Sequence, residues 1–295
     1  MPLDRLTRVL DAHVLALEEA GTAKGEESIV VSIQPAEDDR GPRFLLKGEG
    51  PQEFIRMNSN SYLGMGLREE VIAAEEHATR MFGAGPGAVR FISGSYDAHV
   101  VLEEKLAEFH GREAAMIFSS AYATVVSTIT PLTTPETVLV SDELNHNCII
   151  NAMRLSRPAG KAVYPHNDME ALDAALEEWK GKARRALVVT DGIFSMRGDH
   201  APVDEIVELC IQHDPDYEEN VVCVVDDSHG VGAFGHTGRG AEEFTNSKPA
   251  DILLGTLGKA FGVNGGYVAT NAGTVRFLRE SSQMYIYSNP ITVGE

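Results

Sequence analysis

Positive charge and cysteine are both scarce in this sequence. Its 295 residues include 25 Lys and Arg against 44 Asp and Glu, which gives a formal net charge of −19. Because an acidic surface repels phosphates, this balance argues against a nucleic-acid partner, although a local site can still hold a small anion through N–H groups. The three cysteines, Cys148, Cys210 and Cys223, form no CxxC pair, and their odd number does not suggest a disulfide framework. We therefore expect reduced thiols and a cytoplasmic protein.

Long apolar runs are also missing. No stretch approaches the roughly 18 consecutive apolar residues of a membrane span, so we expect none. The N-terminal Met1-Pro2-Leu3-Asp4-Arg5 lacks the apolar segment of a signal peptide. Hydrophobic residues still make up 43% of the chain, which is enough to bury a sizeable core.

The first 56 residues are predicted to form a helix followed by an arm. Apolar residues recur at helical spacing at the start of the chain, namely Leu3, Leu6, Leu10, Val14 and Leu17. A stretch rich in glycine and charge follows, from Gly21 to Gly50, and we expect an extended arm with few fixed elements there. The main body is predicted to begin near Met57.

From Met57 onward, short apolar runs alternate with helical patterns. The clearest runs are Ala115–Phe118, Val138–Val140, Ala186–Thr190, Val221–Val225, Ile252–Leu254 and Tyr267–Ala269. The clearest helical segments between them are Val100–Phe109, Met169–Trp179 and Val203–Ile211. The runs are continuous rather than alternating, as expected for strands covered on both faces. The sequence therefore predicts an α/β fold with a mostly parallel sheet flanked by helices.

Polar segments bounded by glycines follow three of the apolar runs: Asp191–Ser195, Asp226–His229 and Thr256–Lys259. Ligands of open α/β sheets bind at the carboxyl ends of the strands. We therefore expect these three segments to converge on one cleft.

Lys259 lies in a loop of small residues directly after a predicted strand. Low polarity there would lower its pKa toward that of a usable amine. Gly258 and Gly262 would let a flat ligand approach closely. Taken alone, the loop fits a solvated surface lysine better than a catalytic one.

Asp226 ends a predicted buried strand, where an acid is unfavourable unless it is paired. A pyridinium nitrogen is a fitting partner, and His229 could then bond the phenolic oxygen of the same ring. A metal site is the rival interpretation, because Asp and His are metal ligands. No third or fourth ligand follows at suitable spacing, so we predict no metal.

A phosphate could bind where the segment Ser119–Thr124 ends a strand and opens a helix, because the first N–H groups of a helix are free. A simple Ser N-cap is the alternative. Gly83–Gly87 looks like a phosphate loop, but it lacks the Gly-Lys-Ser/Thr ending of one. His146 lies between a strand and a helix and could either stack on an aromatic ring or serve the structure alone.

Four motifs, in this order along the chain, resemble the α-oxoamine synthases, which are fold-type I enzymes that depend on pyridoxal 5′-phosphate (PLP). The motifs are Asp142-x-x-Asn145-His146, Asp191-Gly192-x-Phe194-Ser195-Met196-x-Gly198-Asp199, Asp226-Asp227-Ser228-His229-Gly230-x-Gly232 and Thr256-x-Gly258-Lys259. Shorter matches are Asn60-x-Tyr62-Leu63-Gly64, Arg90-Phe91-Ile92-Ser93-Gly94 and Gly235-x-x-Gly238-Arg239-Gly240. The resemblance runs from about Asn58 to the end of the chain.

The resemblance implies a role for each residue that matches a motif. Lys259 would form the Schiff base with PLP, and Asp226 would pair with the pyridine nitrogen. His229 and Ser195 would hydrogen-bond the ring hydroxyl. His146 would stack on the ring and orient the substrate.

It also implies how the phosphate and the substrate are held. Backbone groups of Ala121 and Tyr122, with the hydroxyl of Thr256, would cradle the phosphate. Ser288 would reach the phosphate bound by the partner subunit of a homodimer with shared active sites. Asn60 would contact the substrate.

The implied reaction condenses an amino acid with an acyl thioester of CoA or an acyl carrier protein, usually with decarboxylation, to give an α-amino ketone. A PLP-dependent aminotransferase, an aldolase-type lyase and a non-catalytic subunit of a synthase are the alternatives. Residues 57–285 would form the PLP-binding domain, and 286–295 would begin the connection to a C-terminal domain. That domain carries an arginine for the amino-acid carboxylate in the family, and we expect it to belong to a longer chain or a separate one.

Overall fold

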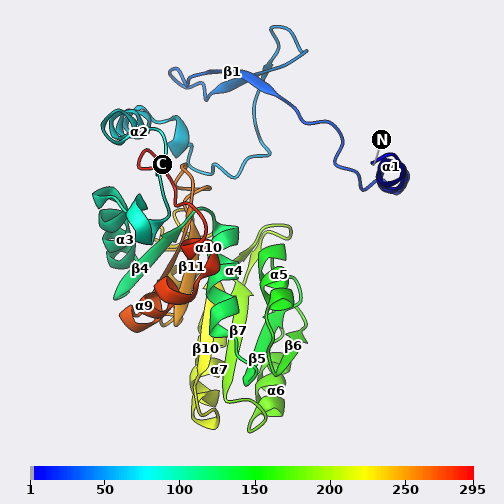
Figure 1. Cartoon of the computed structure of the whole chain (residues 1–295), viewed down its shortest axis with the longest axis vertical. Coiled ribbons are helices and arrows are strands. Elements are labelled where there is room, and N and C mark those ends of the chain that lie inside the picture. The colour runs from blue at the N-terminus through cyan, green and yellow to red at the C-terminus, as the bar shows by residue number, and fades with distance from the viewer. Residues whose placement is uncertain (1–2) are drawn as a thin grey trace. The chain divides into compact units, whose positions relative to one another are not determined.

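The structure is a computed structural model that describes residues 3–295, and it divides into two compact units, one ending at Ser59 and one beginning at Asn60 (Figure 1). The first unit opens with the helix α1 (Asp4–Glu19), so the helix predicted from the leucine spacing is confirmed. No helix among residues 3–295 is both long enough and apolar enough to cross a membrane.

The first unit also holds a three-stranded antiparallel sheet. Its strands are β1 (Val30–Gln34), β2 (Arg43–Leu46) and β3 (Glu53–Phe54). The prediction of an arm with few fixed elements was therefore wrong. Two of the glycines that suggested flexibility form a turn instead: Gly48 and Gly50 take φ values of 89° and 62° between β2 and β3, a conformation that glycine adopts without strain.

The second unit is built on a seven-stranded sheet in the order β4-β12-β11-β10-β7-β5-β6. Its strands are β4 (Ala114–Phe118), β5 (Thr137–Asp142), β6 (Gly160–Tyr164), β7 (Arg185–Asp191), β10 (Val221–Asp226), β11 (Ile252–Thr256) and β12 (Gly266–Thr270). Only β12 runs against the others, because it pairs antiparallel with both β11 and β4. The predicted mostly parallel sheet is confirmed. A short hairpin of β8 (Ile193–Phe194) and β9 (Asp199–His200) lies outside it.

Helices cover both faces of this sheet (Figure 1). The α-helices of the second unit are α2 (Glu69–Phe82), α3 (Asp97–Phe109), α4 (Ala121–Leu132), α5 (Asn147–Leu155), α6 (Met169–Trp179), α7 (Val203–His213), α8 (Ala241–Phe244), α9 (Ala272–Ser281) and α10 (Gln283–Ile286). Shorter helical turns span Met65–Leu67, Arg90–Gly94 and Asp214–Asp216. The three predicted helical segments correspond to α3, α6 and α7.

Successive residues of the central strands point into two separate cores. Val138 and Val140 of β5 pack in the cluster that holds α6 and α7, whereas Leu139 packs in the cluster that holds α4 and α5. Because both faces are buried, the middle positions of such a strand are apolar in succession, and the run is continuous. This is why the central strands could be found from the sequence.

A buried ion-pair network fixes the segment around Arg90. The guanidinium of Arg90 binds both carboxylate oxygens of Glu103 on α3, at 3.1 and 3.2 Å. Glu103 also accepts hydrogen bonds from Arg279 of α9 at 2.7 Å and from the backbone N–H of Ile117 at 3.0 Å. Through Glu103, the matched motif that begins at Arg90 is linked to the helices α3 and α9 and to the strand β4.

Candidate active site

Two buried carboxylates lie side by side at the carboxyl edge of the sheet. Asp226 is the last residue of β10, and it is paired in register with Asp191, the last residue of β7. Asp226 is 5% exposed and Asp191 is 7% exposed. Burial, together with the charge of Asp226, raises the pKa of Asp191 well above its ordinary value. A positive partner would therefore be strongly favoured at this edge.

Asp226 keeps part of its carboxylate available to such a partner. Its Oδ1 accepts hydrogen bonds from Ser228, at 3.1 Å from the backbone N–H and at 2.6 Å from the hydroxyl. Within residues 3–295, its Oδ2 has one hydrogen-bond donor, the Cys148 thiol, which is a weak donor at 3.6 Å. A stronger donor, such as a protonated ring nitrogen, could bind Oδ2 in place of the thiol.

Lys259 supplies positive charge from the loop after β11. Burial lowers the pKa of its ammonium, while the charges of Asp226 and Asp191 oppose that shift. The net effect is downward, so more of the nucleophilic neutral amine is present than for an exposed lysine. The structure thus places Lys259 and Asp226 together, as the sequence predicts.

His146 is the N-cap of α5, and its ring orientation is fixed locally. Its Nδ1 accepts a hydrogen bond from the Cys148 backbone N–H at 3.3 Å and lies 2.9 Å from the Cys148 Sγ. The His146 backbone N–H donates to Asp191 at 2.8 Å. These bonds hold the imidazole at the mouth of the cleft.

His229 is held by Tyr62, whose hydroxyl lies 2.6 Å from Nδ1. Burial and the nearby charges of Lys259 and His146 lower the pKa of His229 to about 4, so the ring is neutral near pH 7. Burial also raises the pKa of Tyr62. The phenol therefore donates to Nδ1, and Nε2 carries the ring hydrogen and can donate to a ligand.

The cleft joins most of the predicted residues. It is lined by Ala121, Tyr122, His146, Cys148, Asp191, Ser195, Asp226, Ser228, His229 and Lys259. The convergence predicted for the segments that follow β7, β10 and β11 is therefore seen. Tyr62, Cys148 and Asp191 were not among the predicted site residues, although Asp191 opens one of the matched motifs.

Three predicted residues do not line this cleft: Asn60, Thr256 and Ser288. The Thr256 hydroxyl donates to the Gly265 carbonyl at 3.1 Å and accepts from the Gly258 N–H at 3.1 Å, so it braces the lysine loop. Ser288 follows α10. Their predicted contacts with phosphate or substrate stay predictions.

The loop after Asp226 is anchored by a second buried acid, Asp227. Its Oδ2 accepts a hydrogen bond from the Ala241 N–H at 2.7 Å. A side chain at Gly240 would place its Cβ 1.8 Å from that oxygen, and Gly240 also has a φ of 94°, so only glycine fits. This anchoring fixes the loop that presents Ser228 and His229.

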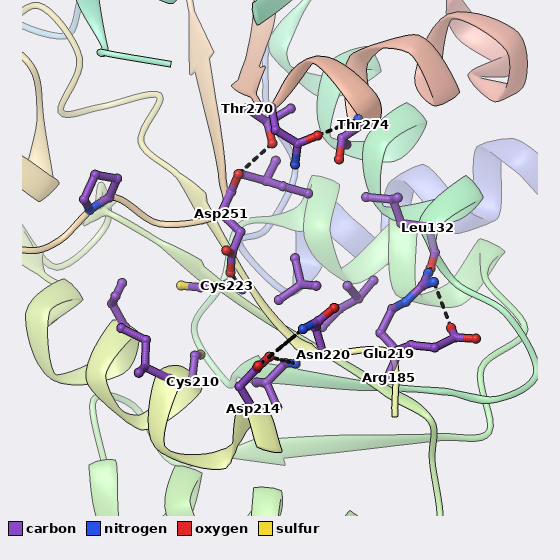
Figure 2. Close-up of a pocket in the computed structure, with 18 of the residues that line it drawn as sticks. Leu132, Arg185, Cys210, Asp214, Glu219, Asn220, Cys223, Asp251, Thr270 and Thr274 are labelled. Carbon is purple, nitrogen blue, oxygen red and sulfur yellow. Dashed lines mark hydrogen bonds and ion pairs between the residues drawn. The ribbon is translucent and has the colours of Figure 1, made fainter. Parts of the chain in front are cut away.

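A larger cavity, of about 890 Å³, lies at the opposite edge of the sheet (Figure 2). Its polar groups already bind one another: Arg185 pairs with Glu219 at 2.9 Å, and Asp251 accepts from the Cys223 N–H at 2.8 Å. The cleft around Lys259 instead presents groups that point at a common space. We therefore assign the chemistry to the smaller cleft.

The cleft around Lys259 has residues that fit the chemical groups of PLP. The first N–H groups of α4, at Ala121 and Tyr122, border the cleft at one end and can bind a phosphate. Asp226 lies where a ring nitrogen can be paired, His229 offers an N–H, and Lys259 offers an amine. The residues present therefore match a phosphate, a pyridine ring and an aldehyde carbon.

Comparison with known proteins agrees with this site. The family description aminotransferase class I and II matches residues 52–293, and the chain belongs to that family. Its relatives and structural neighbours are α-oxoamine synthases, which confirms the resemblance seen in the motifs.

Among the curated relatives, 8-amino-7-oxononanoate synthase of Geobacter sulfurreducens is 40% identical over 267 residues, covering 90% of this chain and 66% of the relative. The enzyme of the same name from Fervidobacterium nodosum is 39% identical over 273 residues, covering 91% of this chain and 67% of the relative. The chain thus spans about two thirds of the length of these relatives.

Solved serine palmitoyltransferases share the fold. That of Sphingomonas wittichii superposes with a TM-score of 0.85 at 28% identity, covering 99% of this chain and 69% of the other. That of S. paucimobilis, solved with a bound PLP–myriocin aldimine, gives 0.84 at 25% identity, again covering 99% and 69%.

Replacing Lys259 should change the titration of His229. In the cofactor-free wild type, the His229 ring should titrate with a midpoint near 4, and Lys259→Met should raise it because one positive charge is removed. Since the unfolded chain takes up a proton near the ordinary value of 6.5, His229 should lower stability progressively as the pH falls from 6.5 to about 4. NMR of the ring protons measures the midpoints, with Lys182→Met as a surface control. A wild-type midpoint near 6.5 would contradict this assignment.

Proposed function

We propose that this chain carries the PLP-binding part of an α-oxoamine synthase. The reaction condenses an amino acid with an acyl thioester of CoA or an acyl carrier protein, usually with decarboxylation, to give an α-amino ketone. The observation that carries the proposal is the convergence of Lys259, Asp226, His146 and His229 on one cleft, in a chain 40% identical to a relative named 8-amino-7-oxononanoate synthase.

PLP supplies, when bound, an electron-withdrawing ring that stabilises negative charge at the substrate α-carbon. Lys259 binds the aldehyde carbon, and Asp226 accepts a hydrogen bond from the ring nitrogen and keeps it protonated. His229, through Nε2, and Ser195 donate to the ring hydroxyl. The N–H groups of Ala121 and Tyr122 would hold the phosphate, and the Thr256 hydroxyl would join them by turning its hydrogen away from the Gly265 carbonyl.

The same side chains serve the substrate. The Lys259 amine would take up the substrate α-proton, and its lowered pKa suits it to act as a base near neutral pH. His146 covers the ring and orients the substrate, and Asn60 contacts it.

We further propose a cytoplasmic homodimer with shared active sites. Residues 57–285 form the PLP-binding domain, and 286–295 begin the connection to a C-terminal domain. A two-fold dimer is the commonest closed assembly. Ser288, which lies outside the cleft of its own chain, serves the phosphate of the partner subunit. All three cysteines are buried and unpaired, in keeping with a reducing compartment, and cell fractionation tests the location.

Sharing of the site can be tested by mixing two inactive chains. Lys259→Ala removes the base, and Ser288→Ala removes the phosphate contact that a subunit gives its partner. A mixed dimer then has one cleft with both groups intact, so thiol release should return to a fraction of the wild-type rate. Measured exchange of subunits with no return of activity would contradict a shared site.

The cofactor and reaction class can be tested on the same purified protein. After incubation with PLP and reduction with borohydride, peptide mapping should find the label on Lys259, and Lys259→Ala should lose it. A screen of amino acids against acyl-CoAs should then show thiol release for at least one pair, and Lys259→Ala should slow that release by about 10²-fold or more, as expected for loss of a general base.

The outcomes separate the alternatives. A labelled Lys259 with no thiol release from any pair would indicate an aminotransferase or an aldolase-type lyase. No PLP binding at all would indicate a non-catalytic subunit. Label on another lysine would overturn the assignment of Lys259.

A further inference from the structure

His213 is a buried histidine that the candidate active site does not use. It ends α7, its side chain is 6% exposed, and its Nε2 lies 2.6 Å from Oδ1 of Asp173 on α6. Because a carboxylate only accepts, Nε2 carries the ring hydrogen. The other nitrogen, Nδ1, is buried and has no hydrogen-bond partner within residues 3–295. In a neutral ring it presents a lone pair, and a buried acceptor left without a donor is unfavourable.

Two further carboxylates lie near this ring, and Asp216 lies on its Nδ1 side. Oδ2 of Asp216 is 3.7 Å from Nδ1, which is beyond hydrogen-bond distance. One ligand atom from each of Glu177, His213 and Asp216 lies within 4.8 Å of the other two. Asp173 and Glu177 are four residues apart on α6, so successive turns of one helix each bring a carboxylate near the ring.

A lysine already places positive charge beside these acids. Nζ of Lys180 lies 2.9 Å from Oδ1 of Asp216 and 3.8 Å from Oε2 of Glu177, and its side chain is 44% exposed. We call the group of Asp173, Glu177, Lys180, His213 and Asp216 the His213 cluster. It holds three carboxylates against one ammonium, so its net charge is −2 when the ring is neutral.

We propose that the His213 cluster binds one divalent transition-metal ion of the Zn²⁺ type, through Nδ1 of His213 and the carboxylates of Glu177 and Asp216. These are ordinary zinc ligands, and at bond lengths of about 2.0–2.2 Å in a tetrahedron their atoms lie about 3.3–3.6 Å apart. The 3.7 Å between Nδ1 and Asp216 is close to that spacing. A site that includes imidazole favours Zn²⁺ over Mg²⁺ and Ca²⁺, which prefer oxygen ligands.

Two features prepare the cluster for an ion. Asp173 accepts the hydrogen of Nε2 and so sets the tautomer and orientation of the ring, as a carboxylate commonly does for a histidine that binds zinc. Glu177 is exposed on the last turn of α6 and can move in, while Lys180 can turn out to solvent. The ion would then replace the ammonium and offset the charge of −2.

The cluster lies away from the cleft around Lys259. His213 and Asp216 lie a few residues before β10, whose other end is Asp226, and a six-residue strand spans roughly 20 Å. The ion would tie the last turns of α6 and α7 to the Asp214–Asp216 turn that enters β10. The sequence predicted no metal, from the residues around Asp226 and His229 at the far end of that strand, and the proposed ion departs from that prediction. An ion at His213 acts on the structure and takes no part in the proposed reaction.

Zinc binding to the full chain tests the proposal. Protein carrying PLP, freed of excess cofactor and treated with a chelator, is titrated with Zn²⁺ against a chromophoric zinc indicator. The wild type should bind one Zn²⁺ per chain. Glu177→Gln should weaken binding by at least about tenfold, and Asp173→Asn by about 10- to 100-fold, the usual effect of losing the residue that orients a ligand. Lys180→Met should tighten binding, because it removes the competing ammonium.

Neighbouring residues on α6 and just beyond it provide matched controls. Glu178→Gln and Lys182→Met make the same chemical changes at positions that pair with each other at 3.7 Å rather than with the cluster, and both should leave zinc affinity unchanged. The two control positions are exposed, as are Glu177 and Lys180, so these four variants should still fold. Failure of the wild type to bind one Zn²⁺ would overturn the proposal, as would an equal loss of affinity in Glu177→Gln and Glu178→Gln.

Discussion

The pairing of buried negative charge with a positive group at the carboxyl edge of the sheet is the constraint on which the site depends. Asp226 and Asp191 end neighbouring parallel strands, so the register of the sheet itself forces the two carboxylates together. Neither can be solvated there, and burial with mutual repulsion makes the uncompensated pair unfavourable. Lys259, entering from the next strand, supplies part of the compensation, and a protonated ring nitrogen would supply more. The strand order that brings β7, β10 and β11 side by side is thus also what assembles the chemistry.

The sequence predicted the parts of the site that lie directly after strands. Continuous apolar runs marked six of the seven strands of the large sheet, and the polar residues following them converged because parallel strands end at one edge. The edge strand β6 was not predicted. One of its faces is exposed, so Lys161 and Val163 alternate with better-buried residues and the strand has no continuous apolar run. The small sheet of the first unit was missed since its turns resemble flexible chain.

Contacts between residues distant in sequence could not be predicted in the same way. The hydroxyl of Tyr62 reaches His229 across 167 residues, and nothing in the spacing of either residue indicates the contact. Cys148 was predicted only to be a reduced thiol, yet it lies between His146 and Asp226. A family motif, conversely, need not mark a ligand contact, because Arg90 turned out to hold α3 through Glu103. Motifs locate residues well, whereas the partners of those residues come from the fold.

Asp226→Asn tests most directly whether this carboxylate keeps the ring of the cofactor charged. The wild type and the variant are each loaded with PLP labelled with ¹⁵N at the ring nitrogen, and the nitrogen chemical shift is followed against pH by NMR. Loss of an opposite charge at this distance should lower the pKa of the ring nitrogen by about one to three units while PLP stays bound. The same ring-nitrogen pKa in both proteins, with PLP equally bound, would contradict the role of Asp226 as the partner of that nitrogen.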